Sequence, residues 1–464
     1  MIIAPAGYGK TYTIADAIEA YRGNKKVLVL THTHAGIASL LEKFKQRNLP
    51  AFKYHLDTIC SFALNLTKIY HINKAEIPHE EQANEMFHFA VEHASRILQA
   101  KPIKALLSAK YDHLIVDEYQ DCTLPQHLMI MVMAETLKTH LLGDFLQGIF
   151  DFNDSIVDFS DISLDDYRDN MQRLDTPWRW NNSGKSALGR DLDLIRTKLI
   201  RKEDIYLSEY SSIELVIASA NDYLYAHSEY KKKLFEVLND DNVLLIHPIS
   251  ETPALRVKFV QQFPQLRMIE SIDDKCYYKY CDTFDRLYGK DLIVSIVEMM
   301  RKLSKTVAIN KWFNERCDLV RKNKEEDLKI RGELASIVDS LIACKSYGKV
   351  AELIDAIRNL PEVKIYRKMI VNDLCNILRD AERLEITAKE SIERNRNIIR
   401  RMGRRIEGKG IGTTLLTKGL EFDTVVVLNA HMFKNPKHLY VALTRCCKRL
   451  VVITETNVLH PYDK

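Results

Sequence analysis

The sequence predicts an α/β protein built on parallel β-sheets, with additional helical insertions. Short apolar runs bounded by polar or turn-forming residues are typical of strands buried inside a parallel sheet. Such runs occur at residues 25–34, 111–121, 139–147, 241–248 and 423–430. Helical stretches such as "TYTIADAIEAY" lie between the runs, which favours βαβ units over a sandwich.

The chain is too long for one ordinary core. At 464 residues, and with about 100 to 200 residues in a usual domain, we expect two to four domains. We place the first domain at residues 1–150, with a small helical insertion at about 62–108. A second α/β domain comprises 151–269 and 409–464. It is divided by 270–408, whose long charged segments predict a helical accessory insertion.

Composition excludes several classes of protein. An apolar fraction of 46% with 28% charged residues is that of an ordinary globular protein. No run of 18 apolar residues and no leader pattern occurs, so we expect a cytoplasmic protein without membrane contact. The nine cysteines lack zinc-ribbon or redox spacing and are expected to be reduced thiols. A net charge of +4 does not by itself indicate nucleic acid, although a basic groove can hide in a nearly neutral total.

"APAGYGKT" near the N-terminus has the spacing of a phosphate-binding loop. Small residues let backbone N–H groups approach phosphate oxygens, and the following helix N-terminus adds a favourable dipole. Lys10 would hold the β and γ phosphates, and the Thr11 hydroxyl would bind Mg²⁺. The loop residues are Ala4, Pro5, Ala6, Gly7, Tyr8, Gly9, Lys10 and Thr11. The alternative is a glycine-rich strand-to-helix turn that binds nothing.

"LIVDEYQD" places Asp117 and Glu118 at the end of an apolar strand. Two adjacent carboxylates there are costly unless they have a chemical role. Asp117 suits Mg²⁺ binding, and Glu118 suits polarising the water that attacks a γ-phosphate. A solvated acidic turn is the alternative, and the phosphate loop upstream argues against it.

Together with these two motifs, six others occur in a fixed order, from residue 4 to about residue 454. The sequence thereby resembles the UvrD/Rep type of superfamily 1 helicases. The phosphate loop is similar to motif I and "VDEYQD" to motif II. The others are "LTHTHAGIASL" (Ia), "HLDTICSFAL" (Ib), "LLGDFLQGIFDF" (III), "LDTPWRW" (IV), "TTLLTKGLEFDTVVVL" (V) and "LYVALTRCCKRL" (VI).

The resemblance implies further contacts to ATP. Gln120 and Gln147 would sense the γ-phosphate, with Asp144 supporting the same network. Arg179 and Arg445 would act in cis as arginine fingers that stabilise charge on the transferring phosphate. The resemblance also implies that Glu421, in motif V, would hold the ribose. Two RecA-like domains would close around ATP and Mg²⁺ and move along single-stranded DNA in the 3′ to 5′ direction.

DNA contacts follow from the same motifs. Single strands are held by backbone electrostatics and by stacking on aromatic side chains, which makes Phe152 a candidate, with Trp178 and Trp180 as further ones. A core role is the alternative for all three aromatic residues. The residues expected to bind DNA are Thr31, His32, Thr33, His34, Asp57, Phe152 and Thr413.

Several positions depart from the family pattern. His32 replaces an aromatic residue, Asp57 and Leu415 replace histidines, and Trp-Arg-Gly is missing after "FDF". The ATPase residues are kept better than the DNA-contact residues, so hydrolysis is expected more firmly than processive unwinding. Only three residues precede the phosphate loop, where the family has an adenine-reading Q motif, so we expect weak discrimination between bases.

Three functions compete at this point. The first is an ATP-dependent 3′–5′ DNA helicase or translocase. The second is a DNA-stimulated ATPase that senses DNA and regulates a partner nuclease with little unwinding; it resembles the UvrD-like component of Gabija antiphage systems, which implies an OLD-like nuclease as partner. The third, a P-loop kinase or GTPase, is disfavoured because motifs III to VI have no place in either class.

Overall fold

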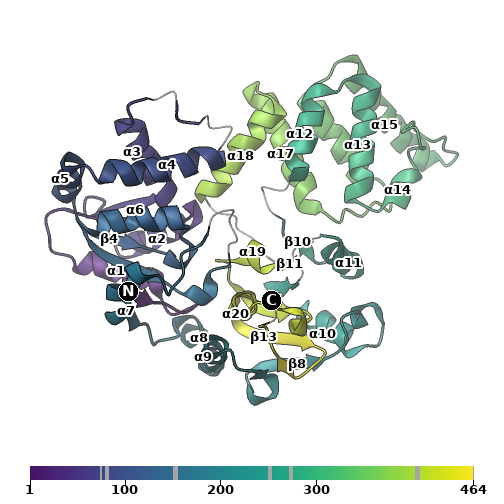
Figure 1. Cartoon of the computed structure of the whole chain (residues 1–464). Helices are drawn as coiled ribbons and strands as arrows, with labels where there is room; N and C mark the ends of the chain where they lie inside the picture. Colours follow the sequence, from purple (N-terminus) through teal and green to yellow (C-terminus); the bar gives the residue numbers. More distant parts are fainter. Residues whose placement is uncertain are drawn as a thin grey trace. The chain divides into compact units, whose positions relative to one another are not determined.

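The protein was analysed as a computed structural model that describes residues 1–73, 76–78, 83–149, 155–248, 253–270, 275–402 and 408–462 (Figure 1). The predicted fold class is confirmed, because the chain forms two parallel six-stranded sheets together with many helices. All five runs predicted as strands contain one.

The first sheet has the strand order β3-β2-β4-β5-β1-β6, with every pair parallel. Its strands are β1 (Ile2–Ile3), β2 (Lys26–Thr31), β3 (Tyr54–Thr58), β4 (Tyr111–Val116), β5 (Lys138–Gly143) and β6 (Gln172–Arg173). Because the strands are parallel, their carboxyl ends meet at one edge of the sheet, which is where ligands bind in such folds.

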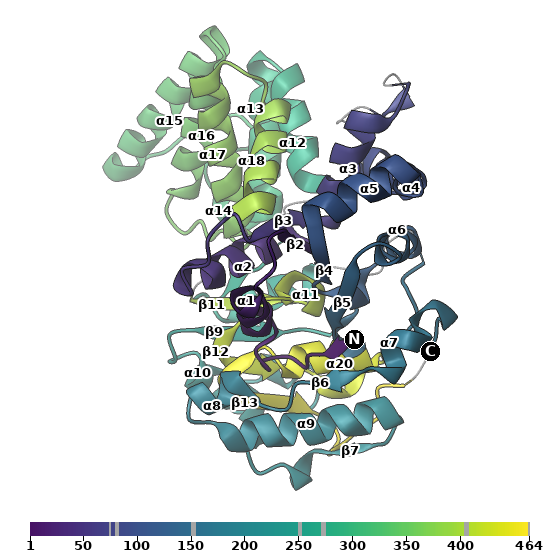
Figure 2. The same cartoon turned by 90° about the vertical axis from the view of Figure 1, so that its left-hand side faces the viewer.

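Helices cover both faces of this sheet. Successive side chains of β2 point to opposite faces, and both sets are apolar, so each face needs a covering layer. Val27 and Val29 pack under α1 (Lys10–Ala20) and α2 (His34–Gln46). Leu28 and Leu30 belong to the core on the opposite face. The helices there include α3 (Ile59–Tyr70), α4 (Ala83–Leu98), α5 (Lys101–Lys110) and α6 (Leu124–Ala134). Figure 2 shows α1 and α2 on one side of β2, β4 and β5, with α4 to α6 on the other.

The second sheet has the order β10-β11-β9-β12-β13-β8. Its strands are β8 (Ile213–Ile217), β9 (Val243–Ile246), β10 (Arg267–Met268), β11 (Lys409–Gly412), β12 (Phe422–Val427) and β13 (Cys446–Thr454). A small antiparallel pair joins β7 (Ile205–Tyr206) to β14 (Val458–Leu459). The helices near the candidate site are α8 (Trp178–Asn182), α9 (Ser186–Arg201) and α20 (Pro436–Leu443).

A helical bundle separates β10 from β11 in the sequence (Figure 1). It packs around one apolar core that includes Ile296, Leu353 and Leu374. Its helices are α12 (Lys275–Arg286), α13 (Gly289–Leu303), α14 (Thr306–Asn310), α15 (Glu325–Ala343), α16 (Tyr347–Arg358), α17 (Lys368–Leu384) and α18 (Ala388–Met402). Among the described residues, none of the helices is both long and apolar enough to cross a membrane.

The chain divides into two compact units. The first comprises residues 1–222, 400–405 and 418–464, and the second comprises residues 223–399 and 406–417. The phosphate loop, the acidic pair and both candidate arginines all belong to the first unit, so the candidate site can be described within one body.

Candidate active site

The phosphate loop connects β1 to α1, and two of its glycines are required by geometry. Gly7 and Gly9 have φ of 77° and 82°, in the left-handed region that glycine adopts without strain. A Cβ atom on Gly7 would lie 2.9 Å from Arg179 Cβ, and one on Gly9 would lie 2.9 Å from Trp178 Cδ1. Residues of α8 therefore pack directly against the loop, and a side chain at either glycine would collide with them.

Lys10 lies between the two predicted acidic residues. Its Nζ is 2.8 Å from Asp117 Oδ1 and 2.5 Å from Glu118 Oε1. Burial lowers the pKa of Lys10, but the two carboxylates outweigh burial and raise it overall. The structure thus brings together the cation and the anions that the sequence placed in separate motifs.

The two carboxylates differ in their surroundings. Burial raises the pKa of Asp117, whereas for Glu118 the cations Lys10 and Lys418 outweigh burial and lower the pKa to about 2. Asp117 keeps 6% of its side-chain surface exposed and Glu118 keeps 35%, so water reaches Glu118 more easily. Glu118 also has a φ of 55°, a costly conformation for a residue with a side chain and one that occurs at functional sites.

A chain of hydrogen bonds connects Glu118 to the end of β5. Gln120 Nε2 donates to Glu118 Oε2, and Gln120 Oε1 accepts from the Asp144 backbone N–H at 3.0 Å. Gln147 Nε2 donates to Asp144 Oδ2 at 3.3 Å. The two glutamines expected to sense the γ-phosphate are therefore held by the same aspartate.

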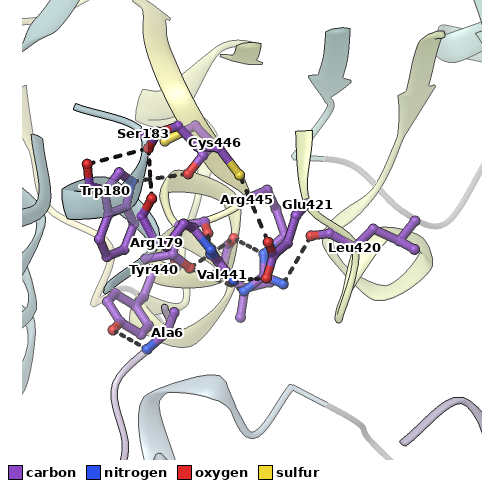
Figure 3. Close-up of polar contacts among 12 residues, drawn as sticks. Ala6, Arg179, Trp180, Ser183, Leu420, Glu421, Tyr440, Val441, Arg445 and Cys446 are labelled. Atoms are coloured by element: carbon purple, nitrogen blue, oxygen red, sulfur yellow. Dashed lines mark hydrogen bonds and ion pairs between the residues drawn. The ribbon is translucent and has the colours of Figure 1, made fainter. Parts of the chain in front are cut away.

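Of the two candidate arginines, Arg179 lies beside the phosphate loop, and Arg445 lies near Arg179. The Arg179 backbone N–H donates to Gly7 O at 3.0 Å, and its guanidinium donates to Thr444 O and, at 2.5 Å, to Glu421 Oε1 (Figure 3). Arg445 donates to Val441 O at 3.0 Å and is 3% exposed. Burial, followed by the positive charge of Arg179, lowers the pKa of Arg445 to about 10.

Two features of this region were not expected from the sequence. Tyr440, in α20, accepts a hydrogen bond from the Ala6 N–H of the phosphate loop at 3.3 Å (Figure 3). Glu421, whose expected role is to hold a ribose, forms an ion pair with Arg179. The only sequence signal for Tyr440 is its place within "LYVALTR".

A buried ion pair lies near Glu118. Lys418 Nζ contacts both carboxylate oxygens of Asp121 at 2.6 Å, with 10% and 2% of the two side chains exposed. Burial raises the pKa of Asp121 to about 6 and lowers that of Lys418. Sequence reasoning missed this pair, because 297 residues separate its members.

The residues present fit Mg²⁺ and a triphosphate. Asp117 Oδ1 is buried and contacts Lys10, but has no hydrogen bond of good geometry among the described residues. Such an oxygen is suited to a cation. Thr11 follows Lys10 directly at the start of α1, and its role as a second Mg²⁺ ligand stays a prediction. Gly7 and Gly9 carry no side chain, which suits a loop whose backbone N–H groups bind phosphate oxygens.

The predicted DNA-contact residues 31–34 and Asp57 lie at or just after the carboxyl ends of β2 and β3. Thr31 is fully buried, and the Thr33 hydroxyl caps α2 by accepting from Gly36 N at 3.0 Å. Asp57 accepts from the Thr58 N–H at 2.8 Å. His34 is the first residue of α2. Thr33 and Asp57 thus make local backbone hydrogen bonds, and the contact of this group with DNA stays a prediction.

His32 lies close enough to Glu118, Lys418 and Lys10 to interact with them electrostatically. Its Nε2 lies 3.4 Å from Cys122 Sγ. Burial lowers its pKa to about 4, so the ring is neutral near pH 7. Thr413 is 2% exposed and belongs to the second unit. Phe152 lies outside the described residues.

Known proteins match parts of this chain that include residues of the candidate site. Residues 1–153 match an AAA domain. Exonuclease/helicase subunit RexA of Lactococcus lactis subsp. cremoris (strain MG1363) is 28% identical over 114 residues, which are 24% of this chain and 9% of that protein. An ATP-dependent helicase/nuclease subunit from strain SK11 shows the same identity and coverage. The chain therefore spans only a small part of the length of these curated relatives.

A solved structure matches along most of the chain, but weakly. It is the complex of Arterivirus nonstructural protein 10 (helicase) with DNA, with 10% identity and a TM-score of 0.34 over 97% of this chain and 60% of that chain. The AAA domain match is therefore the finding that bears most directly on the candidate site, because it contains Lys10, Asp117 and Glu118.

Proposed function

We propose that the protein is an ATP-dependent 3′–5′ helicase or translocase that acts on single-stranded DNA. One observation carries the ATPase part: Lys10 contacts both Asp117 and Glu118, directly beside a glycine-dependent phosphate loop. The AAA domain match over residues 1–153 and the helicase subunits similar to this chain support the same class. The direction of movement and the choice of DNA rest on the motif resemblance.

Each residue has a role that follows from its position. Backbone N–H groups of the loop and Lys10 would bind the phosphates, which requires Lys10 to exchange its carboxylate partners for phosphate oxygens. Thr11 and Asp117 would hold Mg²⁺, which neutralises phosphate charge when bound. The Glu118 carboxyl group is ionised at neutral pH. It would orient the attacking water and take a proton from it.

The residues around the loop would complete the site. Arg179 and Arg445 would stabilise the charge that develops on the transferring phosphate, and Arg179 must first leave Glu421. Trp178 is 52% exposed beside Gly9, so its indole is free to stack on a nucleotide base. Gln120 and Gln147 would report on the γ-phosphate through their shared contacts to Asp144.

The test is to measure ATP hydrolysis with and without single-stranded DNA, and strand displacement from duplexes with a 3′ or a 5′ tail. We expect hydrolysis stimulated by DNA and displacement from the 3′-tailed duplex only. Lys10→Ala is the negative control, since it removes the phosphate contact. Hydrolysis that is absent under all conditions in the wild-type protein would refute the ATPase.

A second function has one observation in its favour. The bacterial proteins similar to this chain are named as subunits that combine helicase and nuclease activities. An ATPase that senses DNA and controls a partner nuclease, as in an antiphage system, would hydrolyse ATP on DNA without displacing a strand. The displacement assay therefore separates the two functions.

A further inference from the structure

Asp144, at the carboxyl end of β5, is a buried carboxylate with donors on both oxygens. Its side chain is fully buried. Oδ1 accepts from Leu146 N at 3.2 Å and from Arg196 Nη2 at 2.8 Å. Oδ2 accepts from Gln147 Nε2 and from Arg196 Nε, each at 3.3 Å. Arg196 supplies two of the four donors and is the cation paired with this buried charge.

Arg196 reaches Asp144 from α9, where it occupies a core-facing position. It is 8% exposed and lies among the buried residues Leu192, Ile195 and Leu199 of the same helix. A charged side chain at such a position is costly unless it is paired, and a buried ion pair is often no more stable than an apolar replacement. Stability alone therefore does not account for this pair, and its location directs attention to the residues that Asp144 holds.

The contacts of Asp144 continue to the water-activating carboxylate. The Asp144 N–H donates to Gln120 Oε1, which leaves the Gln120 amide nitrogen to donate to Glu118 Oε2. Gly143 allows this arrangement, since a Cβ there would lie 2.3 Å from Gln120 Oε1. The amide of Gln120 is thus held in one orientation, with its oxygen towards β5 and its nitrogen towards Glu118.

We infer that Arg196 is a positioning residue for hydrolysis, which acts through Asp144 and Gln120 to hold Glu118 in the geometry needed to activate water. The inference rests on the proposed ATPase function. Two guanidinium donors of Arg196 bind the two oxygens of Asp144, so the carboxylate cannot rotate. The Asp144 backbone N–H that orients Gln120 then stays in place. A lysine would keep the positive charge, but its single ammonium group could not reproduce the two parallel hydrogen bonds that arginine makes to the carboxylate.

Arg196→Lys is the first variant, with Arg201→Lys on the same helix as its matched control because the Arg201 side chain is 67% exposed. The measurements are kcat and KM for ATP on single-stranded DNA, the stoichiometry of binding of a non-hydrolysable ATP analogue, and the melting temperature. We expect the kcat of Arg196→Lys, per bound nucleotide, to fall roughly tenfold to a hundredfold, as for a misplaced catalytic group. KM, binding stoichiometry and the control should stay close to wild type.

Introducing Arg196→Lys into the Gln120→Ala variant distinguishes a positioning role of Arg196 from a general loss of structure. In Gln120→Ala the connection to Glu118 is already broken, so adding Arg196→Lys should lower kcat little further, because the two changes act on one path. If Arg196→Lys does not fold, the double variant Arg196→Gln with Asp144→Asn replaces the ion pair with an amide pair that leaves no buried charge. Loss of kcat in this folded variant would support the inference equally.

The outcomes distinguish the inference from the function beneath it. A wild-type protein without ATPase activity would refute the proposed function itself. An active wild type with an Arg196→Lys variant of unchanged kcat would overturn the inference alone. An equal additional loss in the wild-type and Gln120→Ala backgrounds would overturn it too, since it would show that Arg196 acts independently of Gln120.

Discussion

Arg179 donates to Glu421 at 2.5 Å, so the guanidinium of a residue whose backbone contacts the phosphate loop is held by a carboxylate from the segment before β12. The Arg179 side chain is 11% exposed and that of Glu421 54% exposed. Because the acidic partner is partly in water, the pair is inexpensive to open, as exposed ion pairs are worth about 1 kcal/mol or less. A nucleotide phosphate can therefore compete for Arg179.

Arg179→Ala should reduce turnover far more than binding. If Arg179 acts as a full arginine finger, kcat should fall on the order of 10³-fold, while nucleotide affinity weakens only modestly. The measurements are steady-state hydrolysis on single-stranded DNA and the Kd for a fluorescent ATP analogue. Arg190→Ala, an exposed arginine in α9, is the control. Equal losses in Kd and kcat would contradict the finger role.

Glu118→Gln should abolish hydrolysis and leave nucleotide binding intact. The amide keeps the shape of the side chain but cannot take a proton from water, and Lys10 remains available for the phosphates. We expect the variant to retain bound ATP that can be recovered unhydrolysed after rapid quenching. Glu42→Gln, whose parent side chain is 65% exposed, should behave as wild type. Near wild-type hydrolysis by Glu118→Gln would show that another residue activates the water.

Gly9→Ala should remove nucleotide binding for a steric reason that Gly184→Ala does not share. Both glycines have positive φ, so each substitution carries a backbone cost of about 1–2 kcal/mol. The new Cβ at Gly9 would also meet Trp178 at 2.9 Å, whereas a Cβ at Gly184 would have no atom within 4 Å among the described residues other than its chain neighbours. Nucleotide titration of both purified variants is the measurement. Similar affinities in the two would show that the loop tolerates a side chain.

Lys418→Met should destabilise the folded protein strongly, because it leaves the Asp121 charge buried without its cation. Removing one partner of a buried pair costs about 3–5 kcal/mol. Urea denaturation with linear extrapolation measures the change in the free energy of unfolding. The control is Lys448→Met, which breaks the exposed pair with Asp423 and should cost about 1 kcal/mol or less.

The double variant Lys418→Met with Asp121→Leu decides the cause of that loss. With both charges removed, much of the stability should return, since apolar side chains suit the buried position. A double variant as unstable as Lys418→Met alone would mean that the loss comes from packing of the lysine stem and not from the unpaired carboxylate.

The sequence by itself determined the parts of the protein that local pattern specifies. The apolar runs at residues 25–34, 111–121 and 139–147 predicted buried parallel strands, because a strand covered by helices on both faces has no polar side. The phosphate loop and the acidic pair could also be predicted from local pattern. Each is a short segment whose chemistry depends on residues that are neighbours in the sequence. The roles assigned through motif resemblance stay predictions until the variants are measured.

Only the tertiary structure decided which distant side chains meet. Arg196 and Asp144 are 52 residues apart, and Lys418 and Asp121 are 297 apart; neither spacing carries a periodic signal. Tyr440 reaches the phosphate loop because α20 packs near it, which no local pattern in either segment encodes. Long-range ion pairs and hydrogen bonds form where packing brings buried charges within reach of one another, and burial then makes the pairing obligatory. The polar contacts that hold Glu118 in position are therefore a property of the packed molecule.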